Sequence, residues 1–168
     1  MRVLGIDCGS EVTGYGVVEP AGKDGDLRCV AAGAIRLTGS ERLPARLARV
    51  FDELRAVIER HHPDAVAIEE VFYAANAKSA LRLGHVRGVA MLAAASCGIE
   101  VAEYAPLTVK SAVVGYGMAE KVQVQEMVMR LLKLEKRPEP PDVADALAIA
   151  ICHLHTSATL LRQHAGAP

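Results

Sequence analysis

Apolar residues occur in short runs over the first forty positions and at helical spacing in the segment that follows. Residues 3–6 form a short apolar run, and residues 12–18 and 29–37 are rich in β-forming side chains. Three strands joined by tight turns predict an antiparallel meander. Residues 43–58 then carry apolar side chains at helical spacing until residues 61–63, His-His-Pro, end the pattern. This segment predicts an amphipathic helix.

The second half of the chain begins with residues 65–68, a continuous apolar run of the kind buried on both faces of a sheet. We expect this strand beside the first one. Residues 74–97 predict a mostly buried helix, in which Gly84 and Gly88 are spaced for close approach of another backbone. Their face is a candidate for pairing with a second copy, with a contact inside the chain as the alternative. The remaining predicted elements are a short strand over residues 99–104, a short helix over 107–114, an amphipathic helix over 122–134 and an almost wholly apolar helix over 142–161. Together these elements predict an α/β fold, a mixed sheet flanked by helices of the ribonuclease H-like type.

Length and composition are those of one folded domain. The chain has 168 residues, of which 51% are apolar and 23% are charged, enough for one sizeable core. We expect a single domain over residues 1–162 and a flexible tail over residues 163–168. Nineteen Lys and Arg residues against twenty Asp and Glu residues give a formal net charge of −1. Any nucleic-acid-binding surface must therefore be a local patch.

Three features predict a cytoplasmic protein without a membrane segment. Asp7 interrupts a secretory leader before its apolar region becomes long enough. The longest uncharged stretches, residues 88–99 and 146–161, are shorter than the roughly 18 to 20 apolar residues of a spanning helix. The four cysteines are scattered and form no C-x-x-C pair, which favours a reducing compartment.

Acidic residues interrupt three otherwise apolar elements. Asp7 ends the first predicted strand, and Glu69 with Glu70 ends the strand before the long helix. Asp142 and Asp145 stand three apart in the last helix, so their carboxylates share one face. Structural roles stay open for some of them: a turn aspartate for Asp7, a first-turn aspartate favoured by the helix dipole for Asp142, and a solvated strand end for one glutamate.

Asp145 is the acid that points most clearly to a functional site. A carboxylate buried without a partner costs roughly several kcal/mol unless it is protonated, paired or coordinated. No Lys or Arg lies within a turn of Asp145 in the sequence. Carboxylates gathered from two strand ends and one helix repel one another, so a cation is expected to offset them. All-oxygen ligands favour magnesium or manganese, and two such ions suit in-line displacement at phosphorus. The pattern therefore predicts phosphodiester hydrolysis.

Five segments, in order and over nearly the whole chain, resemble the RuvC family of bacterial Holliday-junction resolvases: GIDCGS, TGYGVV, AIEEVF, VKSAVVGYGMAEKVQVQEMV and DVADALAIAICH. The resemblance implies a ribonuclease H-like fold, a homodimer, and magnesium-dependent, symmetric nicking of two like strands at a four-way DNA junction in recombination and repair. It also implies a branch-migration motor complex as a partner. By position, it assigns metal binding and catalysis to Asp7, Glu69, Asp142 and Asp145, with two magnesium ions per site and manganese as a substitute.

Two positions near these acids qualify the resemblance. The family motif around the first aspartate usually reads Asp-Pro-Gly-Ser, whereas Cys8 stands here in place of the proline. This change leaves the loop less restrained and places a thiol beside the metal site. Spacing alone does not decide between Glu69 and Glu70. The resemblance favours Glu69 and leaves Glu70 as a supporting or solvent-facing neighbour.

The resemblance also supplies candidate DNA contacts. It places Phe72, followed by Tyr73, at the junction crossover, where an exposed ring stacks on an unpaired base. The alternative for this pair is a hydrophobic plug beneath the next helix. Lys110 and Lys121 match the lysines of the family's VK and AEK segments and are candidates for DNA contact and catalysis, against the alternative of solvated helix lysines. Weaker candidates on the predicted helix over residues 74–97 are Lys78, Arg82 and Arg87.

Three other interpretations compete. Cys152, His153 and His155 invite a zinc site, but residues two apart on a helix point away from each other, and there is no second ligand pair. GID-x-G-S before a glycine-containing hairpin also begins actin-like ATPases and sugar kinases, which bind nucleotide between two domains. A single domain leaves no second wall for that cleft. The remaining alternative is a catalytically silent junction-binding scaffold whose acids hold a structural ion.

Overall fold

The computed structural model of the chain describes residues 1–22, 25–37, 39–70 and 76–165. Its elements in chain order are β1 (Val3–Asp7), β2 (Val12–Pro20), β3 (Leu27–Arg36), α1 (Leu43–His61), β4 (Ala65–Glu69), α2 (Ala77–Ser96), β5 (Val101–Tyr104), α3 (Pro106–Val114), α4 (Lys121–Leu131) and α5 (Pro141–Ala165). The type and order of the predicted elements are confirmed. The bounds differ most at α5, which continues past residue 161 and into the segment expected to be a flexible tail.

The strands form one mixed sheet in the order β3-β2-β1-β4-β5. Strands β1, β2 and β3 pair antiparallel, whereas β4 pairs parallel with β1 and β5 pairs parallel with β4. The predicted meander and the position of β4 beside β1 are both confirmed. The pairing of Ile6 with Ile68 brings the carboxyl ends of β1 and β4 to the same edge of the sheet.

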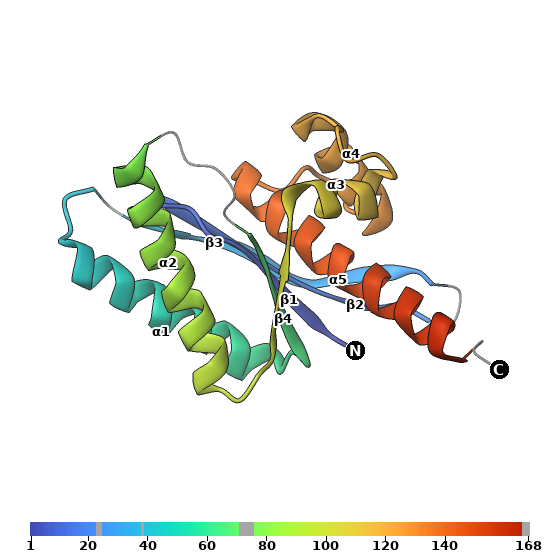
Figure 1. Cartoon of the computed structure of the whole chain (residues 1–168), viewed down its shortest axis with the longest axis horizontal. Coiled ribbons are helices and arrows are strands. Elements are labelled where there is room, and N and C mark those ends of the chain that lie inside the picture. Colours follow the sequence, from blue (N-terminus) through green and yellow to red (C-terminus); the bar gives the residue numbers. More distant parts are fainter. Residues whose placement is uncertain (23–24, 38, 71–75, 166–168) are drawn as a thin grey trace.

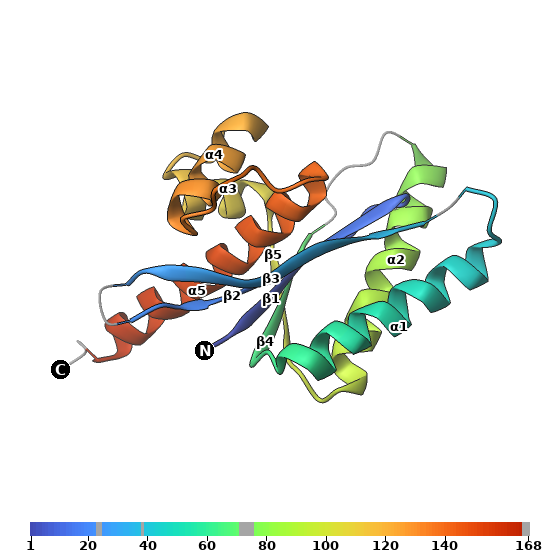
Figure 2. The same cartoon turned by 180° about the vertical axis from the view of Figure 1, so that it is seen from behind.

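Helices cover both faces of the sheet (Figures 1 and 2): α1 and α2 lie on one face, and α3, α4 and α5 lie on the other. Strand alternation sends Leu4 and Ile6 into the core with α1 and α2, and sends Val3 into the core with α5. Residues 146–152 of α5 are all buried, as the apolar pattern predicted. None of the described helices is both long and apolar enough to cross a bilayer.

Glycines in β1 and β2 let α5 lie directly on the sheet. A Cβ atom on Gly5 would lie 2.1 Å from the carbonyl oxygen of Ala146, and one on Gly14 would lie 2.1 Å from the carbonyl oxygen of Asp142. Real side chains do not approach a backbone this closely, so these contacts require glycine. Because Gly14 pairs with Asp7 across β1 and β2, the first turn of α5 is held beside the end of β1.

The expectation that α2 is mostly buried is wrong. Leu81 is 64% exposed and Leu92 is 58% exposed, and a Cβ on Gly84 or Gly88 would meet no atom within 4 Å. Only the opposite side of the helix, which includes Val86, is buried. Because α2 belongs to an outer layer, no described part of the chain covers its far side. We call this surface, made of Leu81, Gly84, Gly88 and Leu92, the α2 outer face.

Candidate functional site

Two carboxylates meet at the edge of the sheet where β1 and β4 end. Because Ile6 pairs with Ile68 in the parallel register, the next residues of the two strands, Asp7 and Glu69, are neighbours at that edge. Asp7 also pairs with Gly14, on which the first turn of α5 rests. The sheet register therefore joins two of the predicted acids, and the close approach of α5 decides where the others lie.

Helix α5 adds the other two predicted carboxylates. Asp145 lines a pocket of about 240 Å³ together with Asp7 and Glu69. The Oδ1 atom of Asp142 lies 3.7 Å from the position that a Cβ on Gly9 would take, so this carboxylate faces the loop after β1. The structure therefore gathers all four acids, three of them in the pocket and Asp142 beside the loop that borders it.

Two lysines from different helices face the same pocket. Lys110 belongs to α3 and Lys121 begins α4. The Nζ atom of Lys121 lies 2.5 Å from Oδ2 of Asp145, which thereby gains a basic partner that its own part of the sequence lacks. The rest of the lining is apolar and consists of Pro106, Val109, Val124 and Ala148.

Burial and mutual repulsion oppose ionisation of the pocket acids. The pKa of Asp7 is raised to about 7, first by burial and then by the charges of the other three carboxylates, while Lys121 lowers it. Burial and the charge of Asp145 raise the pKa of Glu69 against the two pocket lysines. Burial also raises the pKa of Asp145, although its hydrogen bond with Lys121 acts in the opposite direction.

This donor set suits a divalent cation that binds oxygen. The four acids offer only carboxylate oxygens, the ligands that magnesium and manganese take in proteins. The two lysine ammonium groups offset at most two of the four carboxylate charges, and the pKa values of three acids are raised, so the site is short of positive charge. Among the described residues, no three acidic, histidine or cysteine side chains already form a closed ligand set.

Cys8 and Glu70, the sequence neighbours of two of the acids, differ from them. Burial, followed by the charge of Asp7, raises the pKa of Cys8 to about 12, so its thiol is protonated in the cation-free protein. The backbone N–H of Glu70 donates to the carbonyl oxygen of Tyr104 at 2.8 Å, which continues the pairing of β4 with β5. Of the two glutamates, it is Glu69 that lines the pocket, in agreement with the family resemblance.

The predicted DNA contacts lie in different places. Phe72 and Tyr73 lie outside the described residues. Lys78 is exposed near the start of α2. Arg82, one turn further along α2, lines a second pocket that includes Ser10 of the loop after β1. Among the candidates that the structure describes, only Lys110 and Lys121 therefore share the pocket of the acids.

Arg87 is not part of an exposed basic patch, contrary to the expectation. Its guanidinium forms an ion pair with Glu103 of β5, and its Nε donates to the carbonyl oxygen of Glu69 at 3.3 Å. Because both partners lie on strands of the sheet, Arg87 ties α2 to the ends of β4 and β5. It supports the backbone that carries Glu69.

The two histidines of α5 make separate hydrogen bonds. Nδ1 of His153 lies 2.9 Å from the hydroxyl oxygen of Tyr104 in β5, and Nδ1 of His155 lies 2.9 Å from the carbonyl oxygen of Ala112 in α3. The rings thus contact different elements. They join α5 to its neighbours and do not converge on one point.

The sequence analysis missed Arg46 of α1. Its Nη2 donates to the carbonyl oxygen of Ser10, three residues after Asp7, and so ties α1 to the loop beside the acids. In the sequence, Arg46 is one of several arginines on an amphipathic helix, where a solvated side chain is the ordinary expectation. Nothing in the local pattern distinguishes it.

A mixed five-stranded sheet of this order, with acids at the ends of β1 and β4 and on the helix that crosses them, defines a nuclease of the ribonuclease H-like fold. The family model for "Crossover junction endodeoxyribonuclease RuvC" matches residues 3–153, and the chain belongs to the RuvC family, whose members are metal-dependent nucleases. The resemblance found in the five sequence segments is confirmed, and with it the ribonuclease H-like fold.

Individual relatives match over the full length. A Crossover junction endodeoxyribonuclease RuvC from Koribacter versatilis (strain Ellin345) is 67% identical over 167 residues, which cover 99% of this chain and 100% of that protein. The counterpart from Acidobacterium capsulatum is 58% identical, and the match covers 97% of this chain and 98% of that protein. The structure of T. thermophilus RuvC in complex with Holliday junction substrate has a TM-score of 0.90 at 34% identity and covers 95% of this chain and 96% of that one.

Proposed function

We propose that this protein resolves four-way DNA junctions in recombination and repair by hydrolysing one phosphodiester bond in each of two like strands. The observation that carries the proposal is the pocket in which Asp7, Glu69 and Asp145 face Lys110 and Lys121. Membership of the RuvC family supports the same chemistry. The T. thermophilus relative was solved with a Holliday junction substrate, which supports the same substrate here.

We assign two magnesium ions to each site, with manganese as a substitute. Asp7, Glu69, Asp142 and Asp145 offer oxygen ligands from two strand ends and one helix, enough to hold two ions between them. Such ions supply activation of the attacking water and stabilisation of the leaving oxygen in an in-line displacement at phosphorus. The ends of β1 and β4 and the first turns of α5 bring these carboxylates to one edge of the sheet.

Lys110 and Lys121 are assigned to the reacting phosphate. Both side chains reach the pocket of the acids from outside the sheet, and Lys121 is held there by Asp145. Negative charge accumulates on the phosphate oxygens during the displacement. An ammonium group placed beside those oxygens therefore contributes most in the transition state, and less to binding of the intact DNA.

Phe72, Tyr73 and Lys78 are assigned to the crossover of the junction. Phe72 follows Glu69 by three residues in the sequence. Stacking of an aromatic ring on an unpaired base contributes about 1 to 3 kcal/mol and does not depend on sequence. Lys78, exposed near the start of α2, is placed to contact a nearby phosphate.

We assign the α2 outer face to pairing with a second copy of the chain. A four-way junction has approximate two-fold symmetry, and two matched nicks require two sites related by the same axis. Leu81 and Leu92 present exposed apolar side chains, and the open space over Gly84 and Gly88 leaves room for a facing helix. A homodimer formed in this way would bury a surface that is otherwise costly to expose.

The remaining assignments concern the cellular setting. The four cysteines are free thiols, which suits a reducing compartment, and we place the protein in the cytoplasm. The branch-migration motor complex implied by the family resemblance is assigned as the partner that moves the junction past the protein. A pull-down of that motor with junction DNA present and absent tests the second assignment.

The direct test of function is a mobile four-way junction labelled on each strand in turn and incubated with the protein and magnesium. Paired nicks in two like strands are expected in magnesium, and binding without nicking is expected in chelator. Binding without nicking in magnesium would instead indicate a junction-binding scaffold. ATP turnover without nicking would indicate a nucleotide-binding protein, and either result would overturn the proposal.

A further inference from the structure

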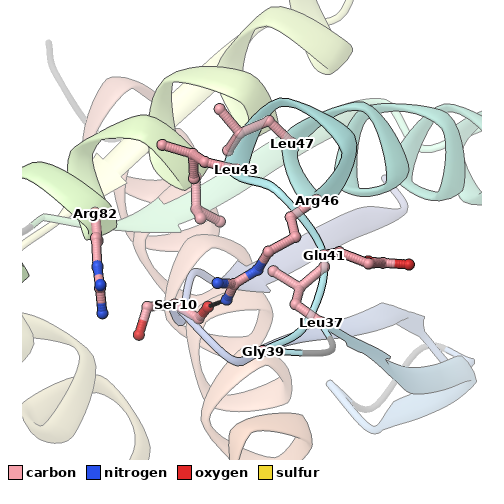
Figure 3. Close-up of a pocket in the computed structure, with 9 residues that line it drawn as sticks. Ser10, Leu37, Gly39, Glu41, Leu43, Arg46, Leu47 and Arg82 are labelled. Atoms are coloured by element: carbon pink, nitrogen blue, oxygen red, sulfur yellow. Dashed lines mark hydrogen bonds between the residues drawn. The ribbon is translucent and has the colours of Figure 1, made fainter.

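A second pocket, of about 270 Å³, opens on the α1 and α2 side of the loop that follows β1. Two basic side chains line it, Arg46 from α1 and Arg82 from α2. Figure 3 shows both guanidinium groups directed toward Ser10, while the carboxylate of Glu41 points away from them. The pocket therefore brings two arginines from different helices to one side of the loop that starts at the catalytic edge of the sheet.

Arg46 is fixed in place with unused donor capacity. Its Nη2 donates to the carbonyl oxygen of Ser10, whereas its Nε is buried and has no hydrogen-bond partner among the described residues. A buried donor without a partner is unfavourable, and a guanidinium presents its N–H groups in a planar fork that matches phosphate oxygens. The geometry of Arg46 is thus suited to an anion with several oxygens.

The positive charge of the pocket also favours an anionic ligand. Arg46 and Arg82 contribute two positive charges, while the one acid in the lining, Glu41, is already paired with Arg49. Helix α1 begins at the pocket without a side-chain cap and without an acidic residue in its first turn. The positive end of its dipole therefore adds to the charge of the arginines.

We propose that Arg46 and Arg82 bind a backbone phosphodiester of the DNA strand close to the bond that is cut. The inference rests on the proposed function. Ser10 follows Asp7 by three residues, so their Cα atoms are at most about 11 Å apart. A DNA strand whose scissile phosphate lies at Asp7 can therefore place a neighbouring phosphate in this pocket. Contacts of this kind carry no sequence information but fix the position of the strand on the acids.

The test compares junction affinity in chelator over a range of salt concentrations for two pocket variants and one control. Arg82→Gln removes an exposed side chain for which the described residues provide no hydrogen bond or ion pair, so its fold should be unaffected. Arg46→Gln removes the second guanidinium. Arg28→Gln is the control, because Arg28 is 63% exposed, pairs with Glu19 and lies near the start of β3 at the opposite end of the sheet.

Each pocket variant should weaken junction binding about tenfold at fixed salt and reduce the slope of log Kd against log salt by about 0.9, the value of one phosphate contact. Arg28→Gln should change neither quantity. Unchanged affinity and slope in both pocket variants would overturn the inference. A lower melting temperature of Arg46→Gln with an unchanged slope in both variants would mean that Arg46 only supports the loop, and would also overturn it. The proposed function fails separately, if the unmodified protein does not nick junctions.

Discussion

The ammonium nitrogen of Lys121 and the Oδ2 atom of Asp145 lie 2.5 Å apart, at the meeting point of α4 and α5. Burial alone would lower the pKa of Lys121, but its hydrogen bond to Asp145 and the charges of Asp145, Asp7 and Asp142 raise the pKa on balance. Lys121 is therefore protonated at neutral pH. The acids that create the need for a cation also hold the Lys121 ammonium in the pocket to which we assign the reacting phosphate.

Replacing either pocket lysine should slow the chemical step far more than it weakens binding. Lys110→Ala and Lys121→Ala are expected to bind junctions within a few-fold of the unmodified protein, because a single ammonium is a small part of the phosphate contacts. Cleavage should fall by about 10²- to 10³-fold, as for loss of one donor to a developing oxyanion. Single-turnover nicking assays with the protein in excess measure this step directly.

A mixed dimer shows whether Lys121 acts within its own site. When one subunit carries Lys121→Ala and the other is intact, the intact site should still cut its own strand and yield nicked, unresolved junctions. Complete loss of nicking would mean that Lys121 acts across the interface or is needed to form the dimer. Lys121 would then no longer be assigned to the reacting phosphate in the site of its own subunit.

Neutral replacements of the pocket acids should separate binding from cleavage. Asp7→Asn, Glu69→Gln and Asp145→Asn are expected to abolish nicking in magnesium while junction binding persists, since they remove ligands for the cation and leave the basic surface intact. Glu70→Gln is the control and should retain most of the activity. If the two glutamate variants behave in the opposite way, the register assigned to the family motif is displaced by one residue.

The close approach of α5 to the sheet can be tested at Gly14. A Cβ at this position would lie 2.1 Å from the carbonyl oxygen of Asp142, so Gly14→Ala must displace the first turn of α5. We expect a loss of about 1 to 3 kcal/mol in the free energy of unfolding, together with a strong loss of nicking because Asp142 moves. Urea unfolding measures the first effect.

The elements and the acids were predictable because their signals are local. Apolar runs and helical spacing depend on residues a few positions apart, and Asp7, Glu69 and Asp145 are conspicuous as charges in apolar elements. The partners of these acids were not predictable from local pattern. Lys121 reaches Asp145 from another helix, and the contact of Arg87 with the end of β4 depends on how α2 crosses the sheet.

Burial of α2 shows a different limit of sequence reasoning. An apolar helix needs a covering surface, but the sequence does not state whether the cover belongs to the same chain. The spacing of Gly84 and Gly88 was compatible with pairing of two copies and with a contact inside the chain, and the structure leaves that side of α2 uncovered by the described residues. The same apolar residues are now assigned to pairing with a second copy.

A charge on the α2 outer face should separate the two copies. Leu92→Glu places a carboxylate on a surface that is 58% exposed in the single chain, so the fold should be retained while the apolar contact between copies is lost. Sedimentation is expected to show a monomer, and junctions should receive unpaired nicks at a low rate. Ala48→Glu adds the same charge to the exposed side of α1 and should remain dimeric. A dimeric Leu92→Glu protein would place the interface elsewhere.

The raised pKa of Asp7 predicts how the stability of the cation-free protein depends on pH. Its folded pKa of about 7 exceeds the usual aspartate value of 3.8, so between these two pH values the folded state keeps a proton that the unfolded state has released. Stability from this group is therefore fully present below about pH 4 and is lost as the pH rises to about 7. In chelator, the free energy of unfolding of the unmodified protein relative to that of Asp7→Asn should fall between pH 5 and pH 8.

The comparison with Asp7→Asn isolates this effect, because the other titrating groups are shared by the two proteins. The variant removes the charge that burial and three carboxylates oppose, so at pH 8 it should be the more stable of the two in chelator. Magnesium should reverse the order, because a cation that binds the ionised carboxylate stabilises only the unmodified folded state. Urea titrations at pH 5 and pH 8, each with chelator and with magnesium, measure all four cases. Equal stability of the two proteins under every condition would show that the ionised Asp7 carboxylate neither destabilises the cation-free fold nor binds the cation.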